Sequence, residues 1–93
     1  MIADFACDET KQIYLGRYAR RLPNQIHRTA RRKLLYLDEA LDINDLRSPP
    51  GNRLEQIHGD REGQWSIRIN EQWRLCFVWN GHNASSVEII DYH

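Results

Sequence analysis

Residues 64–79, QWSIRINEQWRLCFVW, contain two runs in which apolar and polar side chains alternate. Trp65, Ile67 and Ile69 share one face of the first run, and residues 73–79 repeat the same spacing. A period of two is typical of a strand with one face in a core. Since only a short polar link separates the runs, the sequence predicts two neighbouring strands joined by a turn.

Further strands are predicted on both sides of this stretch. Downstream, residues 81–83 (GHN) are typical of a turn, and residues 87–90 (VEII) form an apolar run. Upstream, residues 59–63 form a polar turn bounded by glycines, and residues 54–58 (LEQIH) precede it as a candidate strand. The prolines and glycine of residues 48–52 (SPPGN) interrupt regular structure, so they separate this half of the chain from the first.

The first half of the chain is predicted to be helical. Residues 23–41 carry one apolar stripe at spacings of four and three, which is typical of an amphipathic helix. The members of this stripe are Ile26, Ala30, Leu34, Leu37 and Leu41. A shorter helix is expected at residues 11–14, with Asp8 as its N-cap and its end near Gly16. Residues 1–7 are expected to form a short strand.

The order of these elements predicts the fold class. A short strand and two helices come first, and three or four strands joined by short turns follow. This order favours an α+β fold in which helices pack on one face of an antiparallel sheet. The length of 93 residues fits a single domain spanning residues 1–93.

The composition also restricts the cellular setting. No apolar run approaches the ~20 residues that a membrane helix needs. Residues 1–7 include Asp4 and have no basic start, which argues against a signal peptide and favours the cytoplasm. Cys7 and Cys76 form no paired motif, so two reduced thiols are expected. Cys76 lies in an apolar run and is expected to be a core residue.

Charge is unevenly distributed although 13 basic residues balance 13 acidic ones. Residues 11–33 contain eight basic residues and no acid, whereas residues 34–45 contain four acids and no base. Arginine dominates the basic residues, and its planar fork suits phosphate and carboxylate groups. Part of the surface is therefore expected to be positive although the molecule is neutral. A solvated helix face explains the same block without any partner.

Four features of the second half are candidates for chemistry. Arg68 and Arg74 interrupt the apolar pattern of two adjacent strands, and His58 precedes them. Asp91-Tyr92-His93 directly follows an apolar strand and contains side chains that commonly transfer protons. A solvent-facing arginine pair and a polar chain end explain these features without function. Metal-ligand and nucleotide-binding motifs are absent from the sequence, so no metal or other cofactor is expected.

Motifs throughout this half resemble those of one known family. They are Pro50-Gly51-Asn52-Arg53-Leu54, His58-Gly59-Asp60-Arg61-Glu62-Gly63, Trp65-Ser66-Ile67-Arg68, Trp73-Arg74 and Asp91-Tyr92-His93. With them, residues 1–93 resemble HigB, the plasmid-maintenance branch of the RelE-like toxins of bacterial toxin–antitoxin systems. The resemblance implies a RelE-like fold, with two N-terminal helices packed on a small, twisted, mainly antiparallel sheet.

The same resemblance implies an activity and partners. The chain would be an endoribonuclease that cleaves mRNA in the ribosomal A site without a metal, and so inhibits translation and growth. A HigA-like antitoxin with a helix-turn-helix domain would inhibit it, and the complex would bind operator DNA through the antitoxin. The alternative is a catalytically weak member that acts mainly by binding the ribosome or the antitoxin in operon control. A structural RNA-binding module is a third hypothesis, but it leaves Asp91-Tyr92-His93 unexplained.

Roles for individual residues follow from the resemblance. Arg74 would stabilise the charged phosphate, and His58 would bind phosphate or transfer a proton. Asp91 would act as a base or orient His93. Tyr92 would stack on a base of the RNA or donate a proton.

The resemblance also suggests substrate contacts. Arg68 would be a second phosphate contact, and the arginines of the long helix would meet RNA along their exposed face. These helix residues are Arg28, Arg31 and Arg32. Glu55 stands where some relatives have a histidine, so it is a further candidate near the substrate. The general base therefore remains open among His93, Asp91, His58 and Glu55.

Overall fold

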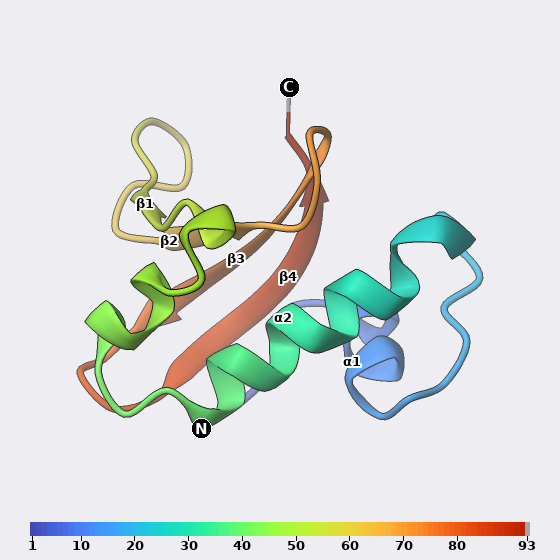
Figure 1. Cartoon of the computed structure of the whole chain (residues 1–93), viewed down its shortest axis with the longest axis horizontal. Helices are drawn as coiled ribbons and strands as arrows, with labels where there is room; N and C mark the ends of the chain where they lie inside the picture. Colours follow the sequence, from blue (N-terminus) through green and yellow to red (C-terminus); the bar gives the residue numbers. More distant parts are fainter. Residues whose placement is uncertain (93) are drawn as a thin grey trace.

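The computed structural model describes residues 1–92. Its helices and strands are α1 (Asp8–Tyr14), α2 (His27–Glu39), β1 (Glu55–Gln56), β2 (Trp65–Arg68), β3 (Trp73–Trp79) and β4 (Ala84–Asp91). Short 3-10 helices lie between them, namely η1 (Asn24–Ile26), η2 (Ile43–Arg47) and η3 (Pro50–Asn52). The four strands neighbour one another in chain order, and each neighbouring pair is antiparallel (Figure 1). In residues 1–92, no helix has the length and apolar character needed to cross a membrane.

The alternating stretch at residues 64–79 forms the centre of the sheet as predicted. β2 and β3 pair so that Ile67 lies opposite Leu75, and Leu75 lies opposite Ile89 of β4. All three side chains are buried and belong to the same core as the apolar stripe of α2. The predicted α+β class and the antiparallel sheet are therefore confirmed (Figure 1).

Two helix-end predictions are wrong. Leu41 was expected on the buried stripe but is 82% exposed, because α2 ends at Glu39 and the backbone is already extended at Ala40. Asp8 is the first residue of α1 rather than its N-cap, a position that Cys7 occupies. The Asp8 carboxylate accepts hydrogen bonds from the Gln12 amide one turn later, in a first turn where negative charge is favourable.

The acidic residues after the basic block have specific partners. Asp38 of α2 accepts hydrogen bonds from the Ile2 amide at 2.9 Å and from the Tyr14 hydroxyl at 3.0 Å. The hydrogen bond to Asp38 is the main reason why the pKa of Tyr14 is raised. Asp42 and Asp45 form a capping box at the start of η2. These carboxylates stabilise local structure rather than oppose the end of α2.

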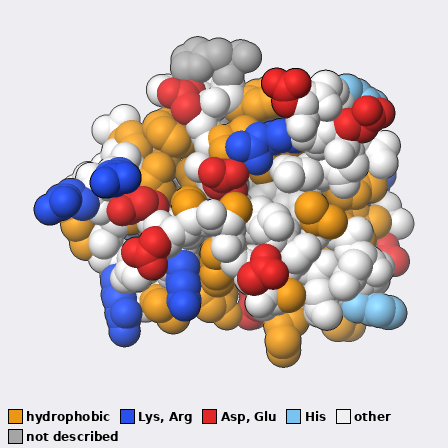
Figure 2. Space-filling model, turned by 180° about the vertical axis from the view of Figure 1, so that it is seen from behind, with side chains coloured by type: hydrophobic (Ala, Val, Ile, Leu, Met, Phe, Trp, Pro, Cys, Tyr) orange, Lys and Arg blue, Asp and Glu red, His pale blue; other side chains and the backbone are white. Residues whose placement is uncertain are grey.

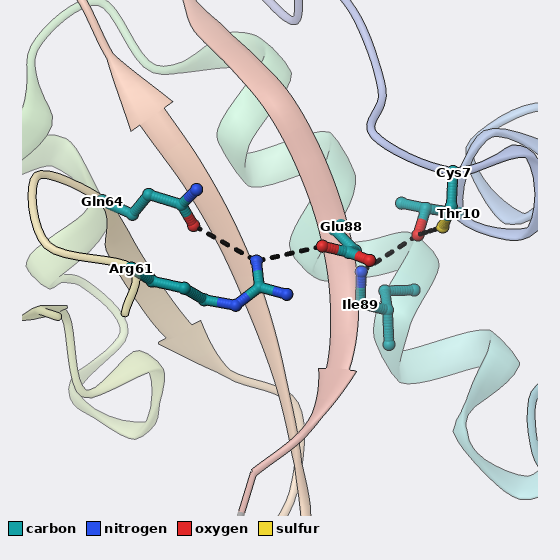
Figure 3. Close-up of polar contacts among 6 residues, drawn as sticks. All are labelled: Cys7, Thr10, Arg61, Gln64, Glu88 and Ile89. Atoms are coloured by element: carbon teal, nitrogen blue, oxygen red, sulfur yellow. Dashed lines mark hydrogen bonds and ion pairs between the residues drawn. The ribbon is translucent and has the colours of Figure 1, made fainter. Parts of the chain in front are cut away.

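The first residues of the chain cover the outer edge of β4. Residues 1–7 form isolated parallel bridges rather than a full strand, with Ile2 opposite Ala84 and Phe5 opposite Val87. Further along the edge, the Ile89 amide donates to the buried Thr10 hydroxyl at 3.0 Å, which also contacts Cys7 Sγ (Figure 3). An edge covered in this way is protected from pairing with another chain.

Cys76 is fully buried, as predicted, but strand alternation puts it on the Arg74 face of β3 and outside the apolar cluster that α2 covers. Burial raises the pKa of its thiol from 9.0 to about 11. Cys7 is only half-buried.

We therefore expect one thiol of the native protein to react much faster than the other. At about pH 8, only about one in a thousand Cys76 side chains is a thiolate, and that thiolate is inaccessible. Titration with the disulfide reagent DTNB should modify Cys7 first, and Cys76 only after unfolding in urea. A Cys7→Ser variant identifies the slow thiol. Equal rates for both thiols in the folded protein would contradict the expectation.

Candidate active site

The face of the sheet that points away from the core carries the candidate site. Since side chains alternate along a strand, the pattern that buries Ile67 and Leu75 turns Arg68 and Arg74 to the opposite face. These two arginines lie opposite each other in the β2–β3 register. A cleft of about 400 Å³ opens beside them. Its lining residues are Arg53, Glu55, Arg68, Asn70, Glu71, Arg74 and Tyr92.

Arg74 is held rigidly at the wall of this cleft and is only 7% exposed. Its Nε donates to Ser66 Oγ at 2.8 Å, and its Nη2 donates to the carbonyl oxygens of Arg53 at 2.7 Å and Ser66 at 3.4 Å. Nη1 faces Glu55 Oε1 across 3.8 Å, which is an ion pair but too long for a hydrogen bond. The ring of Tyr92 lies 5.7 Å from the guanidinium carbon. One side of the guanidinium is therefore anchored, and the Nη1 side faces the cleft.

Arg53 shapes the site through its backbone. It follows η3 with a left-handed conformation (φ 45°, ψ 58°), which is uncommon for a residue other than glycine. This conformation accompanies the carbonyl contact to Arg74, while the exposed Arg53 side chain lines the cleft. Arg53 belongs to the Pro50-Gly51-Asn52-Arg53-Leu54 motif but was not predicted as a site residue. Its position directly after the SPPGN interruption was the available signal.

The backbone before Arg53 is fixed by a buried polar residue. The Asn52 amide donates to the carbonyl oxygens of Leu46 at 3.1 Å and Ser48 at 3.3 Å. Its side-chain oxygen accepts a hydrogen bond from the buried Lys33 ammonium group. Lys33, a member of the predicted basic block, thus stabilises the site indirectly, through its hydrogen bond to Asn52 at the end of η3.

Four of the residues predicted from sequence meet at this cleft. Arg68 and Arg74 supply positive charge, Tyr92 supplies an aromatic ring, and Glu55 supplies a half-exposed carboxylate. Counting Arg53, three arginines line the cleft against two glutamates, so the lining carries a net formal charge of +1, which favours an anion. The same cleft contains Glu71 and Asn70, which sequence analysis did not single out.

His58 and Asp91 do not line this cleft. His58 is exposed and lines a separate hollow of about 310 Å³ beside the 59–63 turn. Asp91 pairs with Trp73 and accepts a hydrogen bond from the Gln72 amide at 3.0 Å. Strand alternation turns it to the face opposite Tyr92. His93, also predicted as catalytic, lies outside the described residues.

The helix arginines do not line the Arg74 cleft. Arg28 and Arg31 line another hollow, next to Tyr18, and Arg32 is exposed on α2. The basic block at residues 11–33 and the strand arginines Arg68 and Arg74 therefore contribute to two separate hollows.

The turn beside the sheet is anchored by a charged pair. Arg61 Nη1 lies 3.0 Å from Glu88 Oε1 of β4 and 3.5 Å from Gln64 Oε1 (Figure 3). These contacts hold residues 59–63 against the polar face. Within residues 1–92, no group of three or more His, Cys, Asp or Glu side chains is arranged to hold a metal ion.

The sequence of this chain is similar to those of known bacterial toxins. Residues 3–93 match the model of the family described as RelE-like toxin of type II toxin–antitoxin system HigB. Toxin HigB-1 of Vibrio cholerae serotype O1 is 48% identical over 60 residues, which cover 64% of this chain and 63% of that protein. Endoribonuclease HigB of Proteus vulgaris is 34% identical over 61 residues, 66% of this chain and 65% of that protein. The matched segments thus span slightly less than two thirds of these two relatives.

A third relative covers more of the chain. An uncharacterized protein of Haemophilus influenzae is 33% identical over 73 residues, which are 78% of this chain and 71% of that protein. It extends the sequence likeness without adding to the chemistry of the cleft.

Proposed function

The chain belongs to the HigB-like toxins, the RelE-like toxins of type II toxin–antitoxin systems, and on this premise we propose that it is an endoribonuclease that cleaves mRNA in the ribosomal A site. The observation that carries the proposal is the anchored Arg74 guanidinium in a cleft with two further arginines and Tyr92. The relative from Proteus vulgaris is named an endoribonuclease. Cleavage of translated message in the cytoplasm would arrest translation and growth.

The proposed reaction is a transfer within the RNA chain. The 2′-oxygen of one nucleotide attacks the adjacent phosphorus, and the bond from phosphorus to the 5′-oxygen breaks. The products are a 2′,3′-cyclic phosphate and a free 5′-hydroxyl. Negative charge grows on the phosphate oxygens as the phosphorus becomes five-coordinate, so preorganised donors directed at these oxygens accelerate the step.

Arg74 is suited to bind that charge because its guanidinium is already held in place. Nη1 faces the cleft, 3.8 Å from Glu55 Oε1. A phosphate oxygen of the substrate would bind to Nη1 next to this carboxylate. Arg68 and Arg53 add positive charge from the same cleft. A rigid donor loses little conformational entropy when the substrate binds. It therefore stabilises the transition state more than a flexible donor would.

Two proton transfers complete the reaction. We assign the base that takes the 2′-hydroxyl proton to Glu55, the carboxylate nearest Arg74, and the donor to the leaving 5′-oxygen to Tyr92 or His93. Tyr92 could also stack on a base of the message. For Asp91 we propose a positioning role through its bond to Gln72, and for His58 a contact with RNA beyond the scissile phosphate.

We also propose that cleavage depends on the ribosome, and the charge of the chain supports this. A protein with no net charge has weak long-range attraction for free RNA, although the cleft itself is positive. Presentation of the message in the A site would compensate by raising the local concentration of substrate. No step of this scheme needs a metal ion.

Membership of a type II family implies an antitoxin partner. We propose that this partner is a HigA-like protein with a helix-turn-helix domain. The complex would reach operator DNA through the antitoxin and repress its own operon.

The test of the function is induced expression without antitoxin, followed by mapping of 5′ ends on cellular messages. We expect growth arrest and new ends confined to translated reading frames. A reporter message without its start codon should stay intact, because ribosomes do not present it. If the folded wild-type chain binds ribosomes or antitoxin but makes no cuts, the catalytically weak binding module becomes the better description.

A further inference from the structure

A second groove, of about 310 Å³, lies between the end of α1 and the start of α2. Its lining includes Ile13, Arg17, Tyr18, His27, Arg28 and Arg31. It shares no residue with the proposed catalytic cleft. The proposed reaction therefore gives no reason for the side chains gathered here.

The groove combines a buried aliphatic floor with an exposed aromatic wall. Ile13 is part of the core, whereas Tyr18 is 65% exposed and its ring packs on His27 at 5.2 Å. The His27 ring is held by a contact between its Nε2 and the Leu22 carbonyl oxygen at 3.0 Å. Leu15, close by in the chain, is also exposed. Large exposed apolar side chains beside a groove are typical of a site that receives an apolar side chain of a partner.

The rim of the groove is positive. Arg17, Arg28 and Arg31 all line it, and within residues 1–92 none of them forms an ion pair at 4.0 Å or less. The Arg31 guanidinium lies over Gly16, where a Cβ would come within 3.5 Å of Nε and where φ is +78°. On the face drawn in Figure 2, most Lys and Arg side chains lie toward the edge formed by α1 and the start of α2.

We propose that this groove is the docking site for an acidic segment of the antitoxin, a partner that rests on the proposed function. Carboxylates of the segment pair with Arg17, Arg28 and Arg31, and one apolar side chain packs against Ile13 and Tyr18. Arginine binds carboxylates through two parallel hydrogen bonds, so three arginines that form no ion pair within the described residues suit such a segment. The aliphatic floor at Ile13 favours an aliphatic side chain of a peptide over a planar RNA base. Because the groove is separate from the cleft, the antitoxin can bind here and leave Arg74 uncovered.

The test compares two variants with equal change in charge. One is Arg28→Glu/Arg31→Glu in the groove, and the control is Arg20→Glu/Arg47→Glu, whose residues line neither the groove nor the cleft. Affinity for the purified cognate antitoxin is measured by calorimetry at several salt concentrations. We expect the groove variant to bind about tenfold or more weaker and the control within about threefold of wild type. The milder Arg28→Gln/Arg31→Gln variant, which adds no negative charge, should show an intermediate loss.

Substitutions in the antitoxin complete the test. Replacing the acids of its docking segment by the matching amides should weaken binding to the wild-type chain but not weaken it further in the groove variant. Such coupling identifies contacting groups. Additive losses, or an affinity of the groove variant equal to that of the control, would overturn the proposal.

Ribosome binding separates this inference from the proposed function. The docking groove replaces the RNA contact expected from the resemblance for Arg28 and Arg31, since neither residue lines the Arg74 cleft. We therefore expect the groove variant to lose no more affinity for purified ribosomes than the control variant does. A selective loss of ribosome affinity with full antitoxin affinity would assign the groove to RNA and reject the peptide. Conversely, if the wild-type chain never cuts message but the groove variant still loses affinity for the antitoxin, the nuclease is refuted and the docking groove is supported.

Discussion

Replacement of Arg74 by alanine is expected to lower mRNA cleavage by about 100- to 1,000-fold, the loss typical when one preorganised donor to a developing charge is removed. Arg74 is the cationic side chain at the cleft that three hydrogen bonds hold in one orientation. A free, flexible cation cannot replace it, because the transition state is stabilised only by donors already in position. The measurement is the single-turnover rate on ribosomes that carry a defined message.

A graded series separates charge, geometry and folding. Arg74→Lys keeps the charge but lacks the planar fork, so it should recover only a small part of the activity. Ser66→Ala keeps the guanidinium and removes the Nε anchor, so it should cause a smaller loss than Arg74→Ala. Circular dichroism and thermal unfolding identify any variant that is not folded. A folded Arg74→Ala protein that cuts at the wild-type rate would exclude the proposed phosphate site.

Replacement of Asn52 by alanine should destabilise the fold by about 3 kcal/mol or more, because it leaves a buried cation without its acceptor. Lys33 is only 6% exposed, and its ammonium group donates to the Asn52 side chain. Burial, followed by the charges of Arg32 and Arg68, lowers the pKa of Lys33. The substitution also removes the hydrogen bonds that the carbonyl oxygens of Leu46 and Ser48 accept.

The pH dependence of this loss has a defined sign. Between its lowered folded-state pKa and the ordinary value of 10.5, Lys33 holds fewer protons in the folded chain than in the unfolded chain. Stability due to this group therefore rises with pH in that window. Urea unfolding should show a smaller loss for Asn52→Ala at high pH than at neutral pH.

A double variant provides the control for Lys33. Lys33→Met/Asn52→Leu removes both partners, so it should recover the part of the loss that comes from the unpaired ammonium group, but not the part that comes from the carbonyl oxygens of Leu46 and Ser48. An Asn52→Ala protein as stable as wild type would show that the Lys33 ammonium group has another acceptor.

Periodicity predicted the centre of the sheet because burial of one strand face depends on local spacing. Residues 73–79 form β3 with the predicted bounds, and Cys76 is buried. The helix ends were less predictable. Leu41 continues the apolar spacing of α2, but the helix ends before it because the backbone at Ala40 is extended. The spacing of apolar residues alone does not predict this change of backbone conformation.

The candidate site was predictable only in part. Arg74 and Arg68 were visible as polar positions in apolar strands, and Tyr92 was visible from the resemblance. Arg53 was not, since its contribution is a carbonyl oxygen presented by a left-handed backbone. His58 looked close to Arg74 in the order of the strands, yet it lines a different hollow.

By itself, then, the sequence determined the elements, the two faces of each strand and the family, because these depend on residues a few positions apart. The tertiary structure decided which charges share a cleft. The Arg53 carbonyl meets Arg74 from 21 positions earlier in the chain. This contact depends on three features. They are the register of β2 and β3, the hydrogen bond between Lys33 and Asn52, and the left-handed backbone of Arg53 after η3. The neutral total charge likewise resolves into two separate arginine-lined hollows only after folding, because local potential depends on distances in space and not on order along the chain.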